Sequence, residues 1–360
     1  MNINETKDFT KKIFKNNLSV VPAYVGVKGI GKTEALKQVA EEMGIGYQAV
    51  YPSSLQGEDF MGLLIKDLES KTTRYLAPDF FPTNSAVKHG LFPKEGVFVL
   101  EELNRADTQT ISALFPLLLE RKINGHELAD GWRMAVSMNP ESMEYTTNTI
   151  DNAGMDRILP INVNPDLEEY ASYMIKHGLG HDDIMNFLFI NKEMLNQDSI
   201  KDNMGKSPSP RGWTKACEIF NHCTLSEGEK RTVLNGLIGP EASASFIGFM
   251  KDRDIVYPVA EEILKNYDKK QQKIIKKIVE SNRYDIMHLT LKKLSMQTDV
   301  KNEKHITNLG KFLADLDYEM KTVFAKQVSM EREDPMELFN KLPEYRDQII
   351  EKLMSLVGAA

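Results

Sequence analysis

The sequence predicts an α/β fold, in which helices cover both faces of a mostly parallel β-sheet, followed by a region that is helical almost throughout. Up to about residue 164, short apolar runs typical of buried strands alternate with helical patterns. Such alternation favours parallel strands joined by crossover helices. A glycine-rich loop joins the first apolar run to the helical pattern that follows it. After Asn164-Pro165 the strand patterns end and only helical patterns remain.

The elements expected in the α/β region follow one another at ordinary spacing. Residues 1–18 fit a short amphipathic helix. From Ile111, apolar residues recur at the i, i+3, i+4, i+7 and i+8 spacing of one buried helix face. Pro116 falls inside this pattern, so it should kink or shorten that helix. The expected strands are the apolar runs at residues 19–25, 46–51, 97–100, 133–138 and 158–163.

The helical region after residue 164 has fewer clear sequence signals for where its elements begin and end. Residues 203–210 are rich in Gly, Ser and Pro and are expected to form a loop. A last helix is predicted because one of its faces would carry Ile349, Ile350, Leu353, Met354 and Val357.

Composition and charge narrow the classes of protein that fit the chain. Its 360 residues are 41% apolar and 27% charged, which is ordinary for a globular protein long enough for two domains. The net charge of −7 argues against generic binding to nucleic acids, whose affinity depends on neutralising phosphates. No apolar run of about 18 residues predicts a membrane span, and the N-terminus has no signal-peptide core. Cys217 and Cys223 are expected to be free thiols, which fits a reducing, cytoplasmic setting.

The strongest motif is the glycine-rich loop at residues 26–33, Gly-Val-Lys-Gly-Ile-Gly-Lys-Thr. It matches G-x-x-x-x-G-K-[ST] at every fixed position, between an expected strand and an expected helix. Glycines let backbone N–H groups turn inward around phosphate oxygens, and the positive end of the next helix points at the same anion. The lysine can reach the β- and γ-phosphates, and the threonine can offer its hydroxyl to Mg²⁺. We therefore predict that a nucleoside triphosphate is bound by Gly26, Lys28, Gly29, Ile30, Gly31, Lys32, Thr33 and Glu34.

Two carboxylates end the third expected strand. Residues 97–100 run directly into Glu101-Glu102, and ligands bind at the carboxyl edge of parallel sheets. Hydrolysis of a bound triphosphate needs one acid to hold hydrated Mg²⁺ and another to orient or deprotonate the attacking water. We assign Glu101, together with Thr33, to the metal, and Glu102 to the water. Without the phosphate loop, a solvated acidic turn would be the commoner interpretation.

The fourth expected strand ends in Met138-Asn139-Pro140. Asn139 would lie at the same edge of the sheet, where it could hydrogen-bond the γ-phosphate or the attacking water. An Asn-Pro pair is also common in plain turns, so the assignment depends on the neighbouring loop and carboxylates. Together these segments predict an enzyme that hydrolyses a nucleoside triphosphate and uses Mg²⁺.

The order of these segments resembles that of the AAA+ ATPases, in particular the MoxR and dynein-related branch. The resemblance extends over about residues 19–250. It implies a P-loop α/β domain (1–164), an all-helical lid (165–250) and a helical C-terminal extension (251–360). Five segments look like named motifs of the family. They are Walker A (26–33), Walker B (100–106, Leu-Glu-Glu-Leu-Asn-Arg-Ala), sensor 1 (138–140), the arginine finger (155–158, Met-Asp-Arg-Ile) and sensor 2 (209–211, Ser-Pro-Arg).

The resemblance also implies how the chain works. Arg157 looks like the finger that reaches the γ-phosphate in a neighbouring subunit, and Arg211 like the lid arginine that contacts the nucleotide of its own subunit. Guanidinium groups suit both roles because their fork geometry matches phosphate oxygens. A surface ion pair is the alternative for either residue. Members of this family form homo-oligomeric rings, usually hexamers, that use ATP and Mg²⁺ to remodel a protein partner, often one with a von Willebrand A domain.

Two hairpins would face the pore of such a ring. Residues 122–132 would turn at Asn124-Gly125, a dipeptide that favours tight hairpin turns. Residues 56–82 resemble the family's helix-2 insertion, with two strands and a turn at 64–68, 73–77 and Glu69-Ser70-Lys71. Surface hairpins without a partner are an equally good interpretation.

Departures from the family pattern keep other functions open. The family usually has Asp where Glu101 stands, and the extra methylene could shift the metal and slow hydrolysis. It often has Phe where Ile158 follows the Asp-Arg pair. One alternative is a GTP-dependent DNA translocase subunit related to McrB, although Met138-Asn139-Pro140 and the acidic net charge lean against it. The other is a non-catalytic scaffold ring that nucleotide only stabilises.

Overall fold

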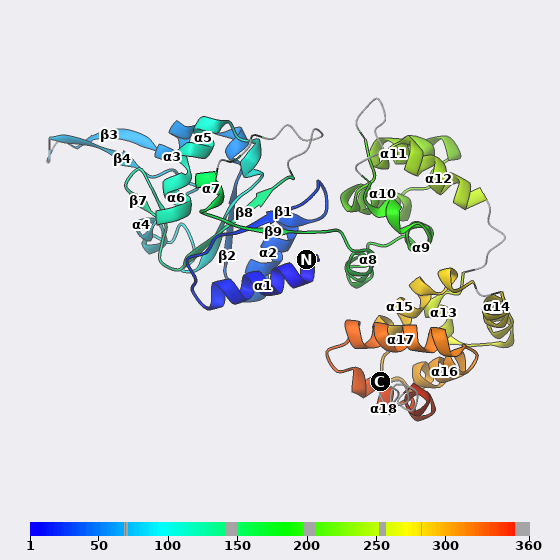
Figure 1. Cartoon of the computed structure of the whole chain (residues 1–360). Coiled ribbons are helices and arrows are strands. Elements are labelled where there is room, and N and C mark those ends of the chain that lie inside the picture. The colour runs from blue at the N-terminus through cyan, green and yellow to red at the C-terminus, as the bar shows by residue number, and fades with distance from the viewer. Residues whose placement is uncertain are drawn as a thin grey trace. The chain divides into compact units, whose positions relative to one another are not determined.

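The structure, a computed structural model, describes residues 1–67, 69, 71–140, 148, 150, 152–197, 206–251, 257–281 and 283–349. The chain divides into two compact units, Met1–Asp166 and Leu167–Ala360, whose elements Figure 1 labels. Each unit has hydrophobic cores of its own. The first unit holds the α/β region, and the described part of the second consists of helices and loops. The three domains expected from the sequence stay a prediction.

A five-stranded parallel sheet forms the centre of the first unit. Across the sheet the strand order is β2-β5-β8-β1-β9, and every pairing is parallel. In chain order the strands are β1 (Pro22–Val25), β2 (Gly46–Val50), β5 (Gly96–Leu100), β8 (Trp132–Met138) and β9 (Leu159–Asn162). Each lies at the place predicted from an apolar run, so the predicted parallel sheet is confirmed.

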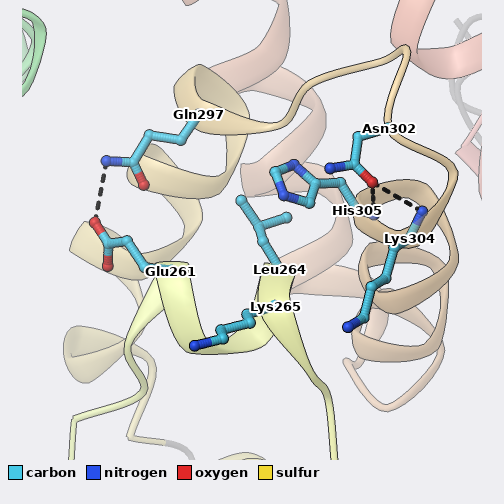
Figure 2. Close-up of a pocket in the computed structure, with 7 residues that line it drawn as sticks. All are labelled: Glu261, Leu264, Lys265, Gln297, Asn302, Lys304 and His305. Atoms are coloured by element: carbon cyan, nitrogen blue, oxygen red, sulfur yellow. Dashed lines mark hydrogen bonds between the residues drawn. The ribbon is translucent and has the colours of Figure 1, made fainter.

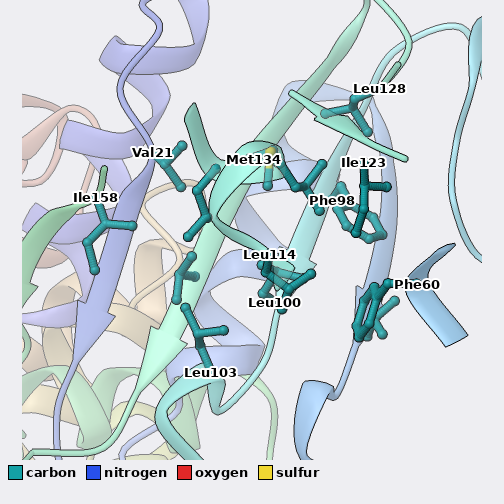
Figure 3. Close-up of a cluster of buried hydrophobic side chains, with 14 of the residues drawn as sticks. Val21, Phe60, Phe98, Leu100, Leu103, Leu114, Ile123, Leu128, Met134 and Ile158 are labelled. Atoms are coloured by element: carbon teal, nitrogen blue, oxygen red, sulfur yellow. The ribbon is translucent and has the colours of Figure 1, made fainter. Parts of the chain in front are cut away.

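The residues of β5 alternate between two cores on opposite faces of the sheet, as the period of a strand requires. Val97 and Val99 lie in the core that includes residues of α1 (Ile3–Lys15) and α2 (Lys32–Met43). Phe98 and Leu100 lie in the other core, with Leu114 and Met134 (Figure 3). Every residue of β5 is buried, as expected for a strand covered on both faces.

Pro116 divides a helix, as the sequence predicts. The apolar pattern from Ile111 is shared by α5 (Thr108–Ala113) and α6 (Phe115–Glu120), which meet at Leu114. Pro116 lies in the first turn of α6, where its missing N–H removes no hydrogen bond of the helix. The other helices of this unit are α3 (Gly57–Met61), α4 (Asn84–Lys88) and α7 (Asn152–Met155), with 3₁₀ turns η1 (Pro52–Ser54) and η2 (Leu103–Arg105).

Both predicted hairpins are present. β3 (Leu63–Asp67) pairs antiparallel with β4 (Thr72–Leu76), and this ribbon extends away from the body of its unit (Figure 1). Its strands begin one residue earlier than expected, and residues 68 and 70 near the turn lie outside the described residues. β6 (Lys122–Ile123) and β7 (His126–Glu127) flank Asn124-Gly125, whose φ angles of 47° and 83° are the left-handed pair that this turn requires.

The helices of the second unit surround two cores. Trp213, Phe187 and Phe246 lie in one, and Phe312 and Phe324 in the other. The helices are α8 (Leu167–Lys176), α9 (Asp182–Ile190), α10 (Pro210–His222), α11 (Glu227–Ile238), α12 (Pro240–Lys251), α13 (Ala260–Lys265), α14 (Lys269–Glu280), α15 (His288–Gln297), α16 (Glu303–Ala314), α17 (Tyr318–Glu331) and α18 (Pro335–Asn340), with 3₁₀ turns η3 (Lys192–Leu195) and η4 (Tyr284–Ile286).

The structure also bears on the expectations about cysteines, membrane spans and the helical region. Cys217 is buried and Cys223 exposed, and both are free thiols as predicted. None of the helices in the described part of the chain has the length and apolar character needed to cross a membrane. Residues 203–205 of the predicted loop lie outside the described residues. Of the apolar face predicted for the last helix, only Ile349 is described, and Ile350, Leu353, Met354 and Val357 lie outside the described residues.

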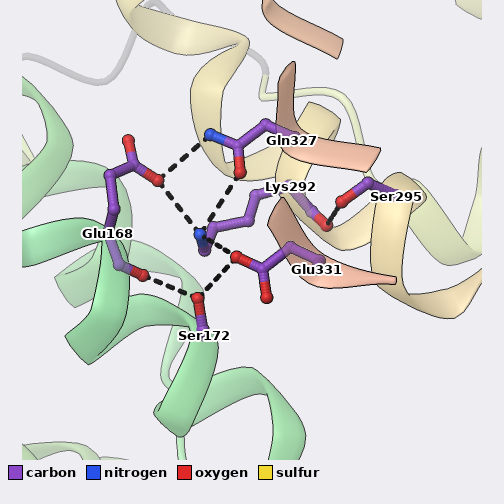
Figure 4. Close-up of polar contacts among 6 residues, drawn as sticks. All are labelled: Glu168, Ser172, Lys292, Ser295, Gln327 and Glu331. Carbon is purple, nitrogen blue, oxygen red and sulfur yellow. Dashed lines mark hydrogen bonds and ion pairs between the residues drawn. The ribbon is translucent and has the colours of Figure 1, made fainter. Parts of the chain in front are cut away.

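A buried lysine joins three helices within the second unit (Figure 4). The side chain of Lys292 on α15 is 0% exposed. Its Nζ donates to the carboxylates of Glu331 on α17 at 2.7 Å and of Glu168 on α8 at 3.0 Å, and to Oε1 of Gln327 at 3.3 Å. A buried ammonium needs such partners, because an isolated charge in the interior is very costly. The cluster therefore links α8 to α15 and α17.

Candidate active site

The loop of residues 26–33 leaves the end of β1 and enters α2 in the conformation that its glycines allow. Gly29 and Gly31 have φ angles of 76° and 102°, in the left-handed region that favours glycine. At Gly26, a Cβ would lie 2.5 Å from Cδ1 of Ile30 and 2.6 Å from the carbonyl oxygen of Val163, so only glycine fits. Gly31 caps α2 without a side-chain hydrogen bond, which leaves the first N–H groups of the helix for a ligand.

Lys32 lies across this loop. Its side chain is buried, and its Nζ donates to the carbonyl oxygens of Gly26 at 2.6 Å and Val27 at 3.0 Å. It also donates to Oδ1 of Asn139, at the end of β8, at 3.2 Å. The structure thus brings together two residues that the sequence assigned to the γ-phosphate. A triphosphate oxygen could replace these neutral acceptors and gain a charge-assisted contact.

Glu101 is 0% exposed, and three hydroxyl groups donate to its carboxylate. Thr33 donates to Oε2 at 2.9 Å, Ser137 donates to the same oxygen, and Tyr47 on β2 donates to Oε1 at 3.2 Å. Burial and the negative charge of Glu101 raise the pKa of Tyr47 well above its usual value. A tyrosine is protonated at neutral pH even at its usual pKa, so this shift keeps Tyr47 a donor over a still wider pH range.

The donor set at Glu101 and Thr33 fits a magnesium ion. Mg²⁺ prefers hard oxygen ligands, and protein sites of this kind supply one or two of them while water and substrate phosphates supply the rest. A buried carboxylate in contact with the threonine hydroxyl of the phosphate loop offers this chemistry. Glu101 and Thr33 are thus the residues that would hold the ion.

Glu102 leaves the sheet edge through an unusual backbone conformation. Its φ and ψ of 51° and 42° are left-handed, which costs about 1 kcal/mol or more for a residue other than glycine. Its N–H donates to Oγ of Ser137 at 3.0 Å, so one hydroxyl contacts both acidic residues. Its carboxylate, 34% exposed, accepts from Nη1 of Arg105 at 2.6 Å. The turn therefore points Glu101 inward and leaves the carboxylate of Glu102 accessible.

A reciprocal pair of hydrogen bonds fixes Asn139. Nδ2 of Asn104 donates to the carbonyl oxygen of Asn139 at 2.8 Å, and the N–H of Asn139 donates to Oδ1 of Asn104 at 3.2 Å. Both residues are buried. This contact joins the turn after Glu102 to the end of β8, so it sets the position of Asn139 relative to Lys32.

The remaining nucleotide-binding candidates lie along the same loop and helix. The side chain of Ile30 belongs to a core, so it can offer a ligand only its backbone. Lys28 and Glu34 are exposed, and Glu34 accepts from Gln38 at 3.3 Å. Their contact with a nucleotide stays a prediction.

The two predicted arginines are described by their surroundings within their own units. Arg157 follows α7 and places its guanidinium carbon 5.1 Å from the ring centre of Phe115, a cation–π distance. Arg211 is exposed at the start of α10, where Ser209 caps the helix by accepting from the N–H of Gly212 at 3.2 Å. Because Arg211 belongs to the second unit, its contact with nucleotide stays a prediction, as does the reach of Arg157 to a neighbouring subunit.

Sequence reasoning missed Tyr47, Ser137 and Asn104 as site residues. Ser137 could have been found, because it lies in β8 two residues before Asn139, which directly follows the strand, and alternate residues of an extended chain point to the same side. Asn104 was recognised only as part of a family segment, and nothing in residues 46–50 singles out Tyr47.

A pocket of about 440 Å³ lies in the second unit, between α13 and the start of α16 (Figure 2). Several of its polar groups hydrogen-bond to one another. Gln297 donates to Glu261 at 3.1 Å, and Oδ1 of Asn302 accepts from the N–H groups of Lys304 and His305 as a helix cap. This pocket therefore offers no set of convergent groups for a reaction.

Comparison with known proteins adds little to this geometry. No protein-family model matches the chain, and no curated protein does so either. Among solved structures it is similar to the Thermotoga maritima RuvB Holliday junction branch migration motor, at 13% identity over 78% of this chain and 76% of that chain, with a TM-score of 0.36. A point mutant of the same protein gives 13% identity, 78% and 77% coverage and a TM-score of 0.38. At these values the similarity carries no information about ligand or partner.

Proposed function

We propose that this chain, an α/β P-loop protein of AAA+ fold with a helical second unit, hydrolyses ATP with Mg²⁺. One observation carries the proposal. Lys32 is buried between the carbonyls of its loop and Asn139, while Thr33 contacts the buried carboxylate of Glu101. A triphosphate binder needs a cation, a metal-holding acid and a polar group at one edge of a parallel sheet, and these residues meet there.

Each residue would have a separate task in hydrolysis. Amides of residues 29–33 and the ammonium of Lys32 would bind the triphosphate, while Asn139 would orient its terminal group. Magnesium, when bound by Thr33 and Glu101, would neutralise charge on the phosphates. Glu102 would leave Arg105 and accept a proton from the attacking water, or orient that water.

We further propose that the active form is a homo-oligomeric ring of MoxR type, a hexamer like the usual rings of this branch, and that it works in the cytoplasm. Arg157 would act on the nucleotide of the neighbouring subunit and Arg211 on that of its own. Hydrolysis would then move the lid (165–250) against the large domain (1–164), with the extension (251–360) specific to this protein's task.

The proposed partner is a protein that the ring remodels or activates, and by analogy with the MoxR branch it carries a von Willebrand A domain. The β3–β4 ribbon supports a protein partner, because Leu63, Leu64 and Leu76 are 67%, 52% and 51% exposed on it. Apolar side chains gathered on an exposed ribbon are typical of contact sites for other proteins.

Steady-state phosphate release tests the proposal against its two alternatives. We expect Mg²⁺-dependent release from ATP, weak competition by GTP and no stimulation by DNA. A preference for GTP, or stimulation by DNA, would favour the McrB-like translocase. Tight ATP binding without turnover, even with a co-purifying protein present, would favour the scaffold ring.

A further inference from the structure

The surroundings of Glu101 explain why a glutamate can stand where related proteins usually have aspartate. Its side chain has one more rotatable bond than aspartate, so an unrestrained carboxylate would occupy more positions. Here both oxygens are restrained. Thr33 and Ser137 donate to Oε2, and Tyr47 donates to Oε1.

We propose that Tyr47 is a positioning residue for Glu101, and that this site requires glutamate rather than merely tolerating it. The inference rests on the proposed function and extends it to residues outside the phosphate loop. Tyr47 reaches Glu101 from β2, the strand next to β5 in the sheet. An aspartate at 101 would end one methylene short of that hydroxyl and leave it without this acceptor.

The three donors have different roles. Thr33 would turn its hydroxyl toward the metal when nucleotide binds, which removes one restraint on Oε2. Ser137 keeps its contact with that oxygen because it is also fixed by the N–H of Glu102 at 3.0 Å. The hydroxyl of Tyr47 donates to Oε1 of Glu101, so removing this hydroxyl releases that oxygen from its restraint. The effect should appear in metal-dependent binding and not in the binding of nucleotide alone.

Equilibrium binding of ATP, measured by calorimetry in Mg²⁺ and in EDTA, tests this role without depending on turnover. Tyr47→Phe should lower the gain in affinity that Mg²⁺ provides by roughly tenfold, the usual effect of losing a hydrogen bond to a charged group. Its affinity in EDTA should match that of the wild type. Glu101→Asp should show the same loss, and adding Tyr47→Phe to it should cause little further loss, because the contact is already broken.

Tyr24→Phe is the matched control. Tyr24 lies in β1 of the same sheet, is 0% exposed, and its hydroxyl contacts Thr10 at 2.8 Å. The Tyr24→Phe variant should be less stable than the wild type, but Mg²⁺ should raise its affinity for ATP as much as it raises that of the wild type. The inference is overturned if Tyr47→Phe keeps that effect too, or if Glu101→Asp binds Mg²⁺-ATP more tightly than the wild type. Wild type that fails to bind ATP in Mg²⁺ would instead overturn the proposed function, and this inference with it.

Discussion

Glu102→Gln is expected to lower ATP turnover by about 10²- to 10⁴-fold, the range that a positioned general base supplies. The amide cannot accept a proton from water, yet it can still accept the hydrogen bond from Arg105 seen at 2.6 Å. The fold and the phosphate loop should therefore be unaffected. ATP should bind as tightly as to wild type and remain uncleaved, which single-turnover kinetics with labelled ATP would show.

Glu127→Gln provides the control for this substitution. Glu127 on β7 pairs with Lys122 at 2.7 Å, and both side chains are about half exposed, so the change removes a surface ion pair of little value. Its turnover should equal that of the wild type. If Glu102→Gln kept more than roughly a tenth of wild-type turnover, Glu102 could not be the residue that activates water.

Lys292→Met is expected to destabilise the second unit by about 3–5 kcal/mol, the usual cost of removing one member of a buried ion pair. Methionine has nearly the same length but leaves Glu168 and Glu331 without their shared cation. Urea unfolding at pH 7, followed by the far-ultraviolet circular dichroism of the helices, would measure the loss.

Lys293→Met is the control, because Lys293 follows Lys292 on α15 but pairs with two exposed carboxylates, those of Asp182 (52% exposed) and Glu261 (53% exposed). Each of these pairs should contribute no more than about 1 kcal/mol. Equal midpoints for the two variants would contradict the role given to Lys292.

The pH dependence of unfolding gives a second readout for Lys292. Burial raises the pKa of Glu168, but the charge of Lys292 and hydrogen bonds from Gln327 and Lys292 outweigh it, so the net pKa is lowered. A carboxyl whose pKa is lower in the folded state stabilises the fold above its unfolded pKa, and this stabilisation is lost as pH falls through the folded pKa. As pH falls, the difference in the free energy of unfolding between wild type and Lys292→Met should therefore shrink, because Glu168 of the variant, buried without its cation, takes up a proton at a higher pH than Glu168 of the wild type.

The sheet and its phosphate loop could be predicted from sequence because their signals are local. Apolar runs and a spaced glycine motif mark the strands and the loop without reference to distant residues. The meeting of Lys32 with Asn139 could also be predicted, since parallel strands bring their carboxyl ends to one edge.

Other parts of the site depend on geometry that the sequence does not display. The contact of Tyr47 with Glu101 requires β2 to lie beside β5. The residues of the two strands do not determine which strands become neighbours in the sheet. Asn104, which hydrogen-bonds Asn139, follows Glu102 in a turn where Glu102 adopts a left-handed conformation, which a residue with a side chain rarely does. Backbone conformations of this kind follow from tertiary contacts and not from local preference.

The central claim is that residues 26–33 bind a nucleoside triphosphate, and titration calorimetry of Mg²⁺-ATP into wild type and Lys32→Ala tests it most directly. The account predicts saturable, one-to-one uptake by the wild type and at least about tenfold weaker uptake by Lys32→Ala, because a charge-assisted contact is lost. No heat of binding with ATP or GTP, or equal affinity in both proteins, would contradict it.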